Sequence, residues 1–418
     1  MKKLEGFRCV ECAAQFSLAE TKSICPRCEG NLSVVYDYKT LRKRLSRRSL
    51  KADPERSLWR YLELLPLEGR LGVAPVDVGW TPLYRARKLG AGLGLKKLYL
   101  KDDGRNPSAS FKDRASAVVA ARAVQTGERI VAGASTGNAA ASLACMMAAS
   151  ACRPVLFVPR TAPAAKLAQI LVYGAVVLSV DGDYDEAFDL CRKACDEFGW
   201  YNRSTGYNPF TREGKKTCAF ELCEQLDWEV PDLVFVPVGD GNIISGVWKG
   251  FTDFHALGLI DKLPRLVAVQ AEGSAAIARA LKDGGGIRPA RGKTVADSIS
   301  VSLPRDGTAA MQAVRESRGY AVTVCDREIL AAVPAVARGA GVFAEPAAAA
   351  AYAGLAKCAA AGRVRQNDST VILITGSGLK DVQSALRASD RPRRVACDMA
   401  AVRRLVAREG SSWTGRGE

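Results

Sequence analysis

Short apolar runs that alternate with helical stretches constrain the fold of this chain more than any other feature of its sequence. Such runs, rich in Val, Ile, Leu and Phe and followed by small or polar residues, are typical of buried β-strands. They occupy residues 98–101, 129–132, 155–158, 175–180, 232–237, 266–270, 321–324 and 371–374. The helices expected among them include residues 114–126, 164–173 and 186–198, and two Ala-rich helices that begin near residues 139 and 346. Because parallel strands need crossover connections, this alternation predicts an α/β fold with parallel sheets covered by helices on both faces.

The length of 418 residues is more than one hydrophobic core usually supports, so we expect more than one domain. The predicted parts are a small N-terminal unit (1–38), a helical extension (39–78), a large α/β domain (79–110 and 202–386), a small α/β domain inserted in it (111–201), and a basic tail (387–418). The extension is expected to be helical over residues 40–65, with an amphipathic segment before Pro66. In the tail, residues 396–407 are expected to form one helix and the last ten residues to fray.

Two CxxC pairs lie near the N-terminus and are separated by twelve residues. Each pair can present two thiolates to one metal ion, and together they give the tetrahedral four-sulfur site of a zinc ribbon. The ligands are Cys9, Cys12, Cys25 and Cys28. Since no coordination position stays open, we expect the zinc to be structural. Four free thiols in a loop are the alternative.

Lys112 occupies a junction between a strand, a loop and a helix, in the sequence PSASFKD (107–113). Partial desolvation and a nearby helix N-terminus favour the neutral amine, which attacks an aldehyde to form a Schiff base. An exposed lysine at a helix start is the alternative. The chain has a single histidine, His255, within a helical stretch where a structural role is expected. A carbonyl cofactor with lysine as the base therefore fits this chain better than histidine catalysis.

Loops of small and polar residues follow three further strands. They begin with Ser135, with Val238 and with Thr375. Ser, Thr and Asn before a helix cap its free amides, and the same amides can instead bind an anion, which glycines allow to approach closely. The carboxyl ends of strands in an α/β sheet are also where ligands gather. These loops are therefore predicted to bind a ligand, with helix capping alone as the alternative.

Five motifs, in this order along the chain, resemble those of the fold-type-II pyridoxal-phosphate enzymes, which share the fold of the tryptophan-synthase β-subunit. Within that group the chain resembles the threonine synthase family. The motifs are PSASFKD, STGNAAAS, VGDGNI, GVFAEPAAAAA and TGSGLKD. The resemblance extends from about residue 9 to about residue 382, and includes the segment SLWRYLELLP and the leading ribbon. It implies two parallel-sheet α/β domains and pyridoxal 5'-phosphate as cofactor.

The resemblance also implies a role for each loop. Lys112 would bind the cofactor covalently and act as the catalytic base. The amino-acid carboxylate would be bound by Ser135, Thr136 and Gly137. The other cofactor contacts would be Asn138 on the ring oxygen, Thr375 on the pyridine nitrogen, and Gly239, Asp240, Gly241, Asn242 and Ile243 on the phosphate. The implied reaction is a PLP-dependent elimination and replacement that converts O-phosphohomoserine and water to threonine and phosphate.

The chain departs from the family pattern where that pattern binds the substrate phosphate. The family segment NSxNPxRxEGQKT reads TGYNPFTREGKKT here, so Thr205, Gly206 and Thr211 replace Asn, Ser and Arg. Guanidinium groups are natural partners of phosphate, and Arg212 or Lys215 would have to compensate. VGDGNI is also one residue shorter than the family's usual loop, and the side chain of Asp240 is expected to point away from the phosphate. The alternative reading is a serine/threonine dehydratase or a β-replacing lyase acting on serine, phosphoserine or diaminopropionate.

The formal net charge of +16 raises the possibility of a zinc-ribbon protein that binds nucleic acid. The basic stretches 39–51 and 387–408 lack interleaved aromatic residues, so a small amino-acid substrate without nucleic acid is the expectation. No apolar window is long enough for a membrane span, and the N-terminus lacks the apolar core of a secretory signal. Thirteen cysteines and no recognisable disulfide scaffold favour the cytoplasm. The oligomeric state stays open, with a homodimer among the alternatives.

Overall fold

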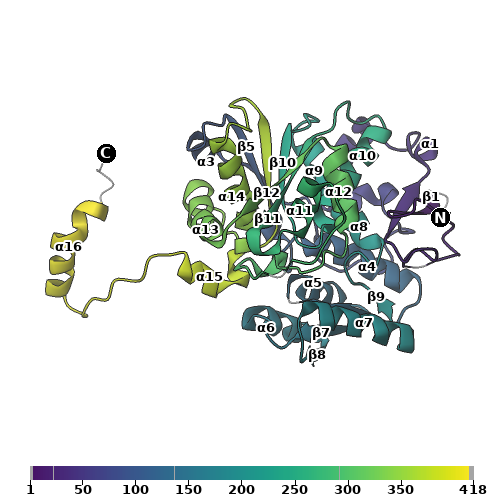
Figure 1. Cartoon of the computed structure of the whole chain (residues 1–418), viewed down its shortest axis with the longest axis horizontal. Coiled ribbons are helices and arrows are strands. Elements are labelled where there is room, and N and C mark those ends of the chain that lie inside the picture. The colour runs from purple at the N-terminus through teal and green to yellow at the C-terminus, as the bar shows by residue number, and fades with distance from the viewer. Residues whose placement is uncertain (1–2, 22, 136, 291, 414–418) are drawn as a thin grey trace.

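The computed structural model describes residues 3–21, 23–135, 137–290 and 292–413 (Figure 1). Its largest sheet has six strands. In spatial order they are β12 (Tyr320–Val324), β11 (Arg265–Ala271), β10 (Leu233–Pro237), β13 (Ser369–Ile374), β5 (Lys97–Asp102) and β4 (Leu83–Arg85). All neighbouring pairs are parallel except β4 with β5. The predicted α/β class with parallel sheets is confirmed.

Helices cover both faces of this sheet, because consecutive residues of its central strands point to opposite faces and are nearly all buried. Leu233 and Phe235 of β10 pack toward one face and Val234 and Val236 toward the other. The first face is covered by α3 (Arg87–Ala91), α13 (Asp326–Ala340) and α14 (Pro346–Ala360). The opposite face is covered by α9 (Thr217–Gln225), α10 (Asn242–Ala256), α11 (Ala276–Asp283) and α12 (Gly307–Glu316).

A second sheet has four parallel strands, in the order β8 (Val176–Val180), β7 (Arg153–Pro159), β6 (Ile130–Ala134) and β9 (Tyr201–Asn202). One face packs on α7 (Tyr184–Phe198), and the other on α5 (Asn138–Met147) and α6 (Ala164–Val172). The strand expected at residues 175–180 is present but not buried, because β8 is an edge strand with Val176 and Leu178 each 39% exposed. The division of the chain at residues 111 and 201 stays a prediction.

A small antiparallel sheet lies at the N-terminal end of the chain (Figure 1). Its strands are β1 (Leu4–Cys9), β2 (Gln15–Phe16) and β3 (Leu32–Tyr36). The segment expected to be helical over residues 40–65 forms three short helices: α1 (Tyr38–Leu41), α2 (Arg47–Ala52) and the 3-10 helix η1 (Leu58–Leu64). Pro54 explains the break between α2 and η1, because a residue before proline is forced out of the helical region, and Asp53 is extended with ψ 120°. Of the apolar face predicted before Pro66, Leu58, Tyr61 and Leu65 are buried and Leu62 is half-buried.

The C-terminal part leaves the body of the molecule after α15 (Val382–Arg387) and ends in α16 (Met399–Trp413), which stands apart in Figure 1. This helix starts three residues later than expected and continues through residues expected to fray. None of the helices in the described part of the chain combines the length and apolar character that crossing a bilayer requires.

Candidate active site

A pocket with an empty volume of about 800 Å³, part of it open to solvent, lies where strand ends of the two parallel sheets meet. Pro237 and Thr375 at the ends of β10 and β13 line it from the large sheet, and Ala134 of β6 lines it from the small one. It also contains most of the predicted site residues, namely Lys112, Ser135, Asn138, Gly239, Asp240, Gly241, Asn242, Ile243 and Thr375. Gly137 is the N-cap residue of α5, and Thr136 lies outside the described residues.

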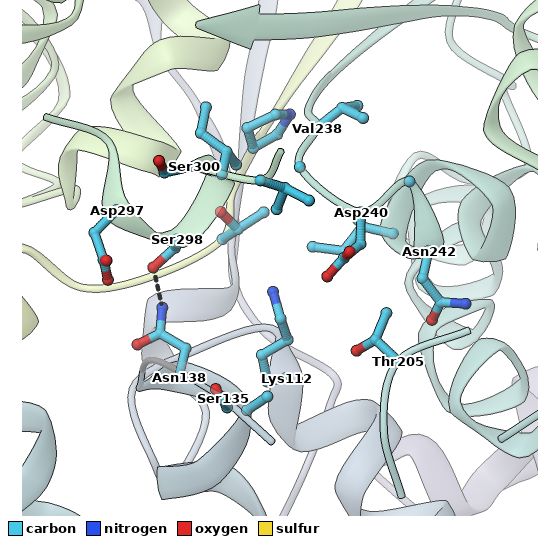
Figure 2. Close-up of a pocket in the computed structure, with 18 of the residues that line it drawn as sticks. Lys112, Ser135, Asn138, Thr205, Val238, Asp240, Asn242, Asp297, Ser298 and Ser300 are labelled. Carbon is cyan, nitrogen blue, oxygen red and sulfur yellow. Dashed lines mark hydrogen bonds between the residues drawn. The ribbon is translucent and has the colours of Figure 1, made fainter. Parts of the chain in front are cut away.

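Lys112 is the first residue of α4 (Lys112–Gln125), and its neighbours in sequence fix its position. Asp113 folds back to accept a hydrogen bond from the backbone N–H of Ser108 at 2.7 Å. Arg114 forms a buried ion pair with Asp103, with 2.6 Å between Nε and Oδ2. The loop before Lys112 is thus held from both sides. Figure 2 shows the Lys112 side chain rising from the helix into the middle of the pocket.

The environment of Lys112 favours a reactive amine. Burial lowers the pKa of Lys112, and the carboxylates of Glu345 and Asp240 oppose that shift. A lowered pKa makes the nucleophilic neutral form more available near neutral pH. This is the property the sequence predicted for a lysine at this junction.

The loop at the end of β10 is shaped to receive an anion. Gly241 has φ +92°, and a Cβ there would lie 2.7 Å from the backbone oxygen of Asp306. A Cβ on Gly239 would lie 3.0 Å from the Cα of Ile299. Only glycine allows the backbone to run this closely. No side chain of the described residues caps the first turn of α10, and Gly241, Asn242 and Ile243 at that turn line the pocket, so its free amides are available to an anion there.

A second uncapped helix start faces the same pocket. The first turn of α5 also lacks a side-chain cap among the described residues. Asn138 opens this helix and donates from Nδ2 to Ser298 Oγ at 3.0 Å and to Glu345 Oε1 at 2.8 Å. Asn138 Oδ1 is buried and has no hydrogen-bond partner within the described part of the chain, so it is available to a ligand.

Thr375 lies directly after β13, and its carbonyl accepts a hydrogen bond from the N–H of Phe111 at 2.9 Å. That bond ties the end of the central strand to the residue before Lys112. The predicted cofactor residues Lys112 and Thr375 are therefore connected through one backbone contact.

The structure places the charged side chains of the two phosphate-related segments. The carboxylate of Asp240 lies at the pocket wall, where it accepts hydrogen bonds from Tyr184 at 3.2 Å and from the N–H of Arg305 at 3.1 Å, and its pointing away from a bound phosphate stays a prediction. Arg212 is buried in an ion pair with Asp306 at 2.6 Å and is not among the residues that line the pocket. Lys215 does line the pocket.

One wall of the pocket was not predicted from the sequence. This wall is formed by Asp297, Ser298, Ile299, Ser300 and Val301. The segment holds only the short 3-10 helix η4 (Asp297–Ile299), so no strand or helix pattern marks it. Its Asp-Ser-Ile-Ser sequence in an otherwise irregular stretch is the one available indication. Tyr184, Thr205 and Glu345 also line the pocket, and of these only Tyr184 lies outside the segments that resemble family motifs.

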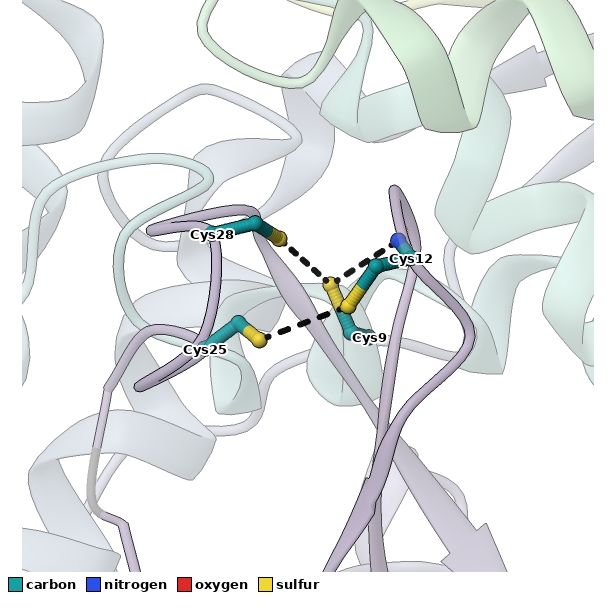
Figure 3. A group of neighbouring side chains, drawn as sticks. All are labelled: Cys9, Cys12, Cys25 and Cys28. Atoms are coloured by element: carbon teal, nitrogen blue, oxygen red, sulfur yellow. Dashed lines mark hydrogen bonds between the residues drawn. The ribbon is translucent and has the colours of Figure 1, made fainter.

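The four N-terminal cysteines form a separate cluster (Figure 3). Their sulfur atoms all lie within 4.8 Å of one another, with 3.5 Å between Cys9 and Cys28 and 3.7 Å between Cys12 and Cys25. A zinc–sulfur bond of ~2.3 Å gives a tetrahedron with edges of about 3.8 Å, whereas a disulfide needs about 2.05 Å. The geometry therefore matches four ligands of one metal ion rather than two disulfides.

Comparison with known proteins identifies the family. The sequence profile of the pyridoxal-phosphate dependent enzyme family matches residues 75–376, which include both parallel sheets and the whole pocket. The chain belongs to the pyridoxal-phosphate dependent enzymes. Threonine synthases from Methanocaldococcus jannaschii and Methanosarcina acetivorans are each 40% identical to it, over 96% of this chain and 98% of the relative.

A solved member of the same fold is diaminopropionate ammonia lyase from Escherichia coli. It aligns with a TM-score of 0.66 at 17% identity, over 82% of this chain and 92% of that one. At that identity the likeness establishes the fold alone, and it confirms the predicted fold-type-II architecture.

The pocket fits the cofactor of this family. Pyridoxal phosphate carries an aldehyde, a phosphate dianion and a ring with two polar atoms. The structure offers it a buried amine at Lys112, the glycine cradle at Gly239 and Gly241, and the unpaired Oδ1 of Asn138. Each observation is independent of the comparisons, and together they match the groups of this cofactor.

Proposed function

We propose that this protein is a PLP-dependent carbon–oxygen lyase that converts O-phosphohomoserine and water to threonine and phosphate. The observation that carries the proposal is 40% identity to threonine synthases over nearly the entire length of both chains. The pocket supports it with the amines of Lys112 and Lys215 and with two uncapped helix starts, which suit an amino acid that carries both a carboxylate and a phosphate.

The proposed cofactor contacts follow the motif order. Lys112 would hold the aldehyde carbon, the backbone from Gly239 to Ile243 would hold the phosphate, and Thr375 and Asn138 would hold the ring. Bound pyridoxal phosphate supplies an electron-withdrawing ring that stabilises negative charge next to the amino-acid Cα. A hydroxyl such as that of Thr375 favours an uncharged ring nitrogen, which suits elimination and replacement better than transamination.

The chain's own groups perform the proton transfers. The start of α5, with Ser135 and Gly137, holds the substrate carboxylate and so orients Cα. Lys112 accepts the Cα proton at Nζ and returns a proton later in the cycle, which its lowered pKa permits near neutral pH. The segment from Asp297 to Val301 forms one wall of the pocket in which these transfers take place.

Purified protein loaded with pyridoxal phosphate is expected to release phosphate from O-phosphohomoserine and to form threonine in equal amount. A phosphate assay combined with amino-acid chromatography measures both products. The replacement of the family arginine by Thr211 favours a second candidate, a dehydratase acting on unphosphorylated serine or threonine. Ammonia and a 2-oxo acid from those substrates, without phosphate release from O-phosphohomoserine, would establish the second candidate instead.

We also propose that the four N-terminal cysteines bind one structural zinc ion. All thirteen cysteines are free thiols, and this set alone is gathered at ligand spacing among the described residues. The ion would fix β1 to β3, and β3 carries Tyr36, whose hydroxyl donates to Glu213 of α8 (Phe210–Lys215) at 2.7 Å.

Replacing Cys25 by serine is expected to remove most of the bound zinc and to lower the melting temperature, because a lost thiolate opens a structural site. Catalysis at temperatures where the variant stays folded should change little. Zinc is measured by atomic emission on dialysed protein. The exposed Cys397 provides the control, since Cys397→Ser should leave the zinc content intact. Full zinc retention in Cys25→Ser would contradict a four-thiolate site.

A further inference from the structure

The replacement of arginine at position 211 coincides with a second departure one helical turn later. The family segment has glutamine where this chain has Lys215, and both positions lie in α8. Residues four apart share one face of a helix. The Thr211 hydroxyl donates to the carbonyl of Asn208 at 2.8 Å and does not line the pocket, whereas Lys215 does. Compared with the family segment, the basic residue on this face of α8 is therefore at position 215 instead of position 211.

Lys215 is 1% exposed, and its Nζ donates to Asn242 Oδ1 at 2.5 Å. An ammonium group has three donors, so two of its hydrogens stay available. No carboxylate of the described residues lies within ion-pair distance of it. The carboxylate of Asp306 already has other partners: it forms an ion pair with Arg212 at 2.6 Å and accepts a hydrogen bond from Asn242 at 2.8 Å. In its protonated form this buried amine has one neutral partner, Asn242, and two N–H groups left for an anion.

The surroundings of Lys215 are electropositive. Burial, followed by the charges of Lys112 and Arg203, lowers the pKa of Lys215 well below its usual value, and Asp306 and Asp240 only partly oppose this. Arg203 is itself 2% exposed, and its Nε has no hydrogen-bond partner in the described structure. A dianion placed among these groups would relieve their repulsion and restore the charge on Lys215.

The backbone of Arg305, together with Asn31 of the N-terminal unit, leaves no room for a side chain at Gly206, where the family segment has serine. Gly206 has φ +81°, and a Cβ there would lie 2.6 Å from the carbonyl oxygen of Arg305 and 3.0 Å from Nδ2 of Asn31. Asn31 donates to both Arg305 O, at 2.7 Å, and Asp306 Oδ1, at 2.9 Å. A serine at position 206 would therefore not fit, so a phosphate bound here would need a hydrogen-bond donor from another residue.

We propose that Lys215 binds the dianion of a phosphate monoester in this pocket and takes the part of the arginine that stands at position 211 in related segments. The inference rests on the proposed function for its setting. The phosphate belongs either to the cofactor, whose cradle includes Asn242, or to the phosphorylated substrate. Both present the same chemistry to the ammonium group.

The test is the Lys215→Gln variant, which carries the residue of the family segment and keeps a donor for Asn242. Cofactor-free full-length protein is titrated with pyridoxal phosphate and, separately, with pyridoxal, which lacks the phosphate. Loaded protein is then assayed for the KM of O-phosphohomoserine and for inhibition by inorganic phosphate. Loss of a charge-assisted hydrogen bond is expected to weaken one phosphate ligand roughly 10- to 100-fold.

Weaker binding of pyridoxal phosphate with unchanged binding of pyridoxal assigns Lys215 to the cofactor. A raised KM and a raised inhibition constant for phosphate, with cofactor affinity unchanged, assign it to the substrate. If all four constants stay within twofold of the wild type, the proposal is overturned. Lys215→Arg, which keeps the charge, should retain more affinity than Lys215→Gln, and equal losses in both variants would also overturn it.

The exposed Lys193 supplies the control for net charge, because Lys193→Gln makes the same charge change at a residue that does not line the pocket. Thermal melting verifies that each variant is folded. If the wild type releases no phosphate from O-phosphohomoserine, the proposed function fails, but the cofactor titration and the inorganic phosphate competition still report on Lys215. The two failures are therefore distinguishable.

Discussion

Replacing Lys112 by alanine is expected to reduce turnover at least about 10³-fold and to abolish the visible absorbance of the loaded protein. Proton transfer by a positioned side chain alone contributes roughly 10²- to 10⁴-fold, and Lys112 would also lose its covalent role. Burial lowers the pKa of this amine, and no other lysine starts a helix inside the pocket in the described structure. Steady-state kinetics and the absorption spectrum measure the two effects. Borohydride reduction followed by peptide mapping identifies the attached residue.

The control for Lys112→Ala is Lys193→Ala on the exposed side of α7, which should keep wild-type kinetics and spectrum. Lys215 makes this experiment sharper, because it is a second buried lysine in the same pocket. Attachment of the cofactor to the Lys215 peptide, with normal turnover in Lys112→Ala, would remove Lys112 from the mechanism.

The site residues that could be predicted from the sequence lie in short continuous motifs at the ends of strands. Each predicted loop joins a strand to a helix, so a parallel sheet places its residues at one edge, and Lys112, Asn138, Asn242 and Thr375 do line one pocket. The wall from Asp297 to Val301 could not be found this way, because it reaches the site through an irregular segment rather than a strand end. The exact partners of Arg212 were equally hidden, since Asp306 lies far away in the sequence.

The N-terminal unit is closer to the site than its sequence suggests. Asn31 contacts Asp306, and Asp306 accepts hydrogen bonds from Asn242 at 2.8 Å and from Ser245 at 2.7 Å. Asn242 in turn accepts from Lys215. One short chain of side chains thus joins the residues beside the cysteine cluster to the helix start that is proposed to bind phosphate. The two differences from the family segment, at Gly206 and Lys215, therefore lie at the two ends of one network of hydrogen bonds that includes Asn31, Asp306 and Asn242.

Replacing Glu221 by glutamine is expected to destabilise the protein by about 3–5 kcal/mol, because it leaves two buried cations without their shared anion. Glu221 contacts Lys101 at 2.6 Å and Arg114 at 2.8 Å, and all three side chains are fully buried. Arg114 also holds Asp103, so the same network fixes the loop that leads to Lys112. Urea denaturation followed by circular dichroism measures the loss. Glu63→Gln, which breaks an exposed pair with Arg44, should cost less than about 1 kcal/mol.

The pH dependence of this difference tests its cause. Burial alone would raise the pKa of Glu221, but Arg114 and Lys101 outweigh it and lower that pKa from 4.5 to about 2. A carboxyl with a depressed folded-state pKa contributes stability above its unfolded value, here on the order of 3 kcal/mol, and loses it as the pH falls. The gap between wild type and Glu221→Gln should therefore be constant above about pH 5 and shrink as the pH falls from 4.5 toward 2. A gap that persists unchanged at low pH would mean that packing, not charge, holds the loop beneath Lys112.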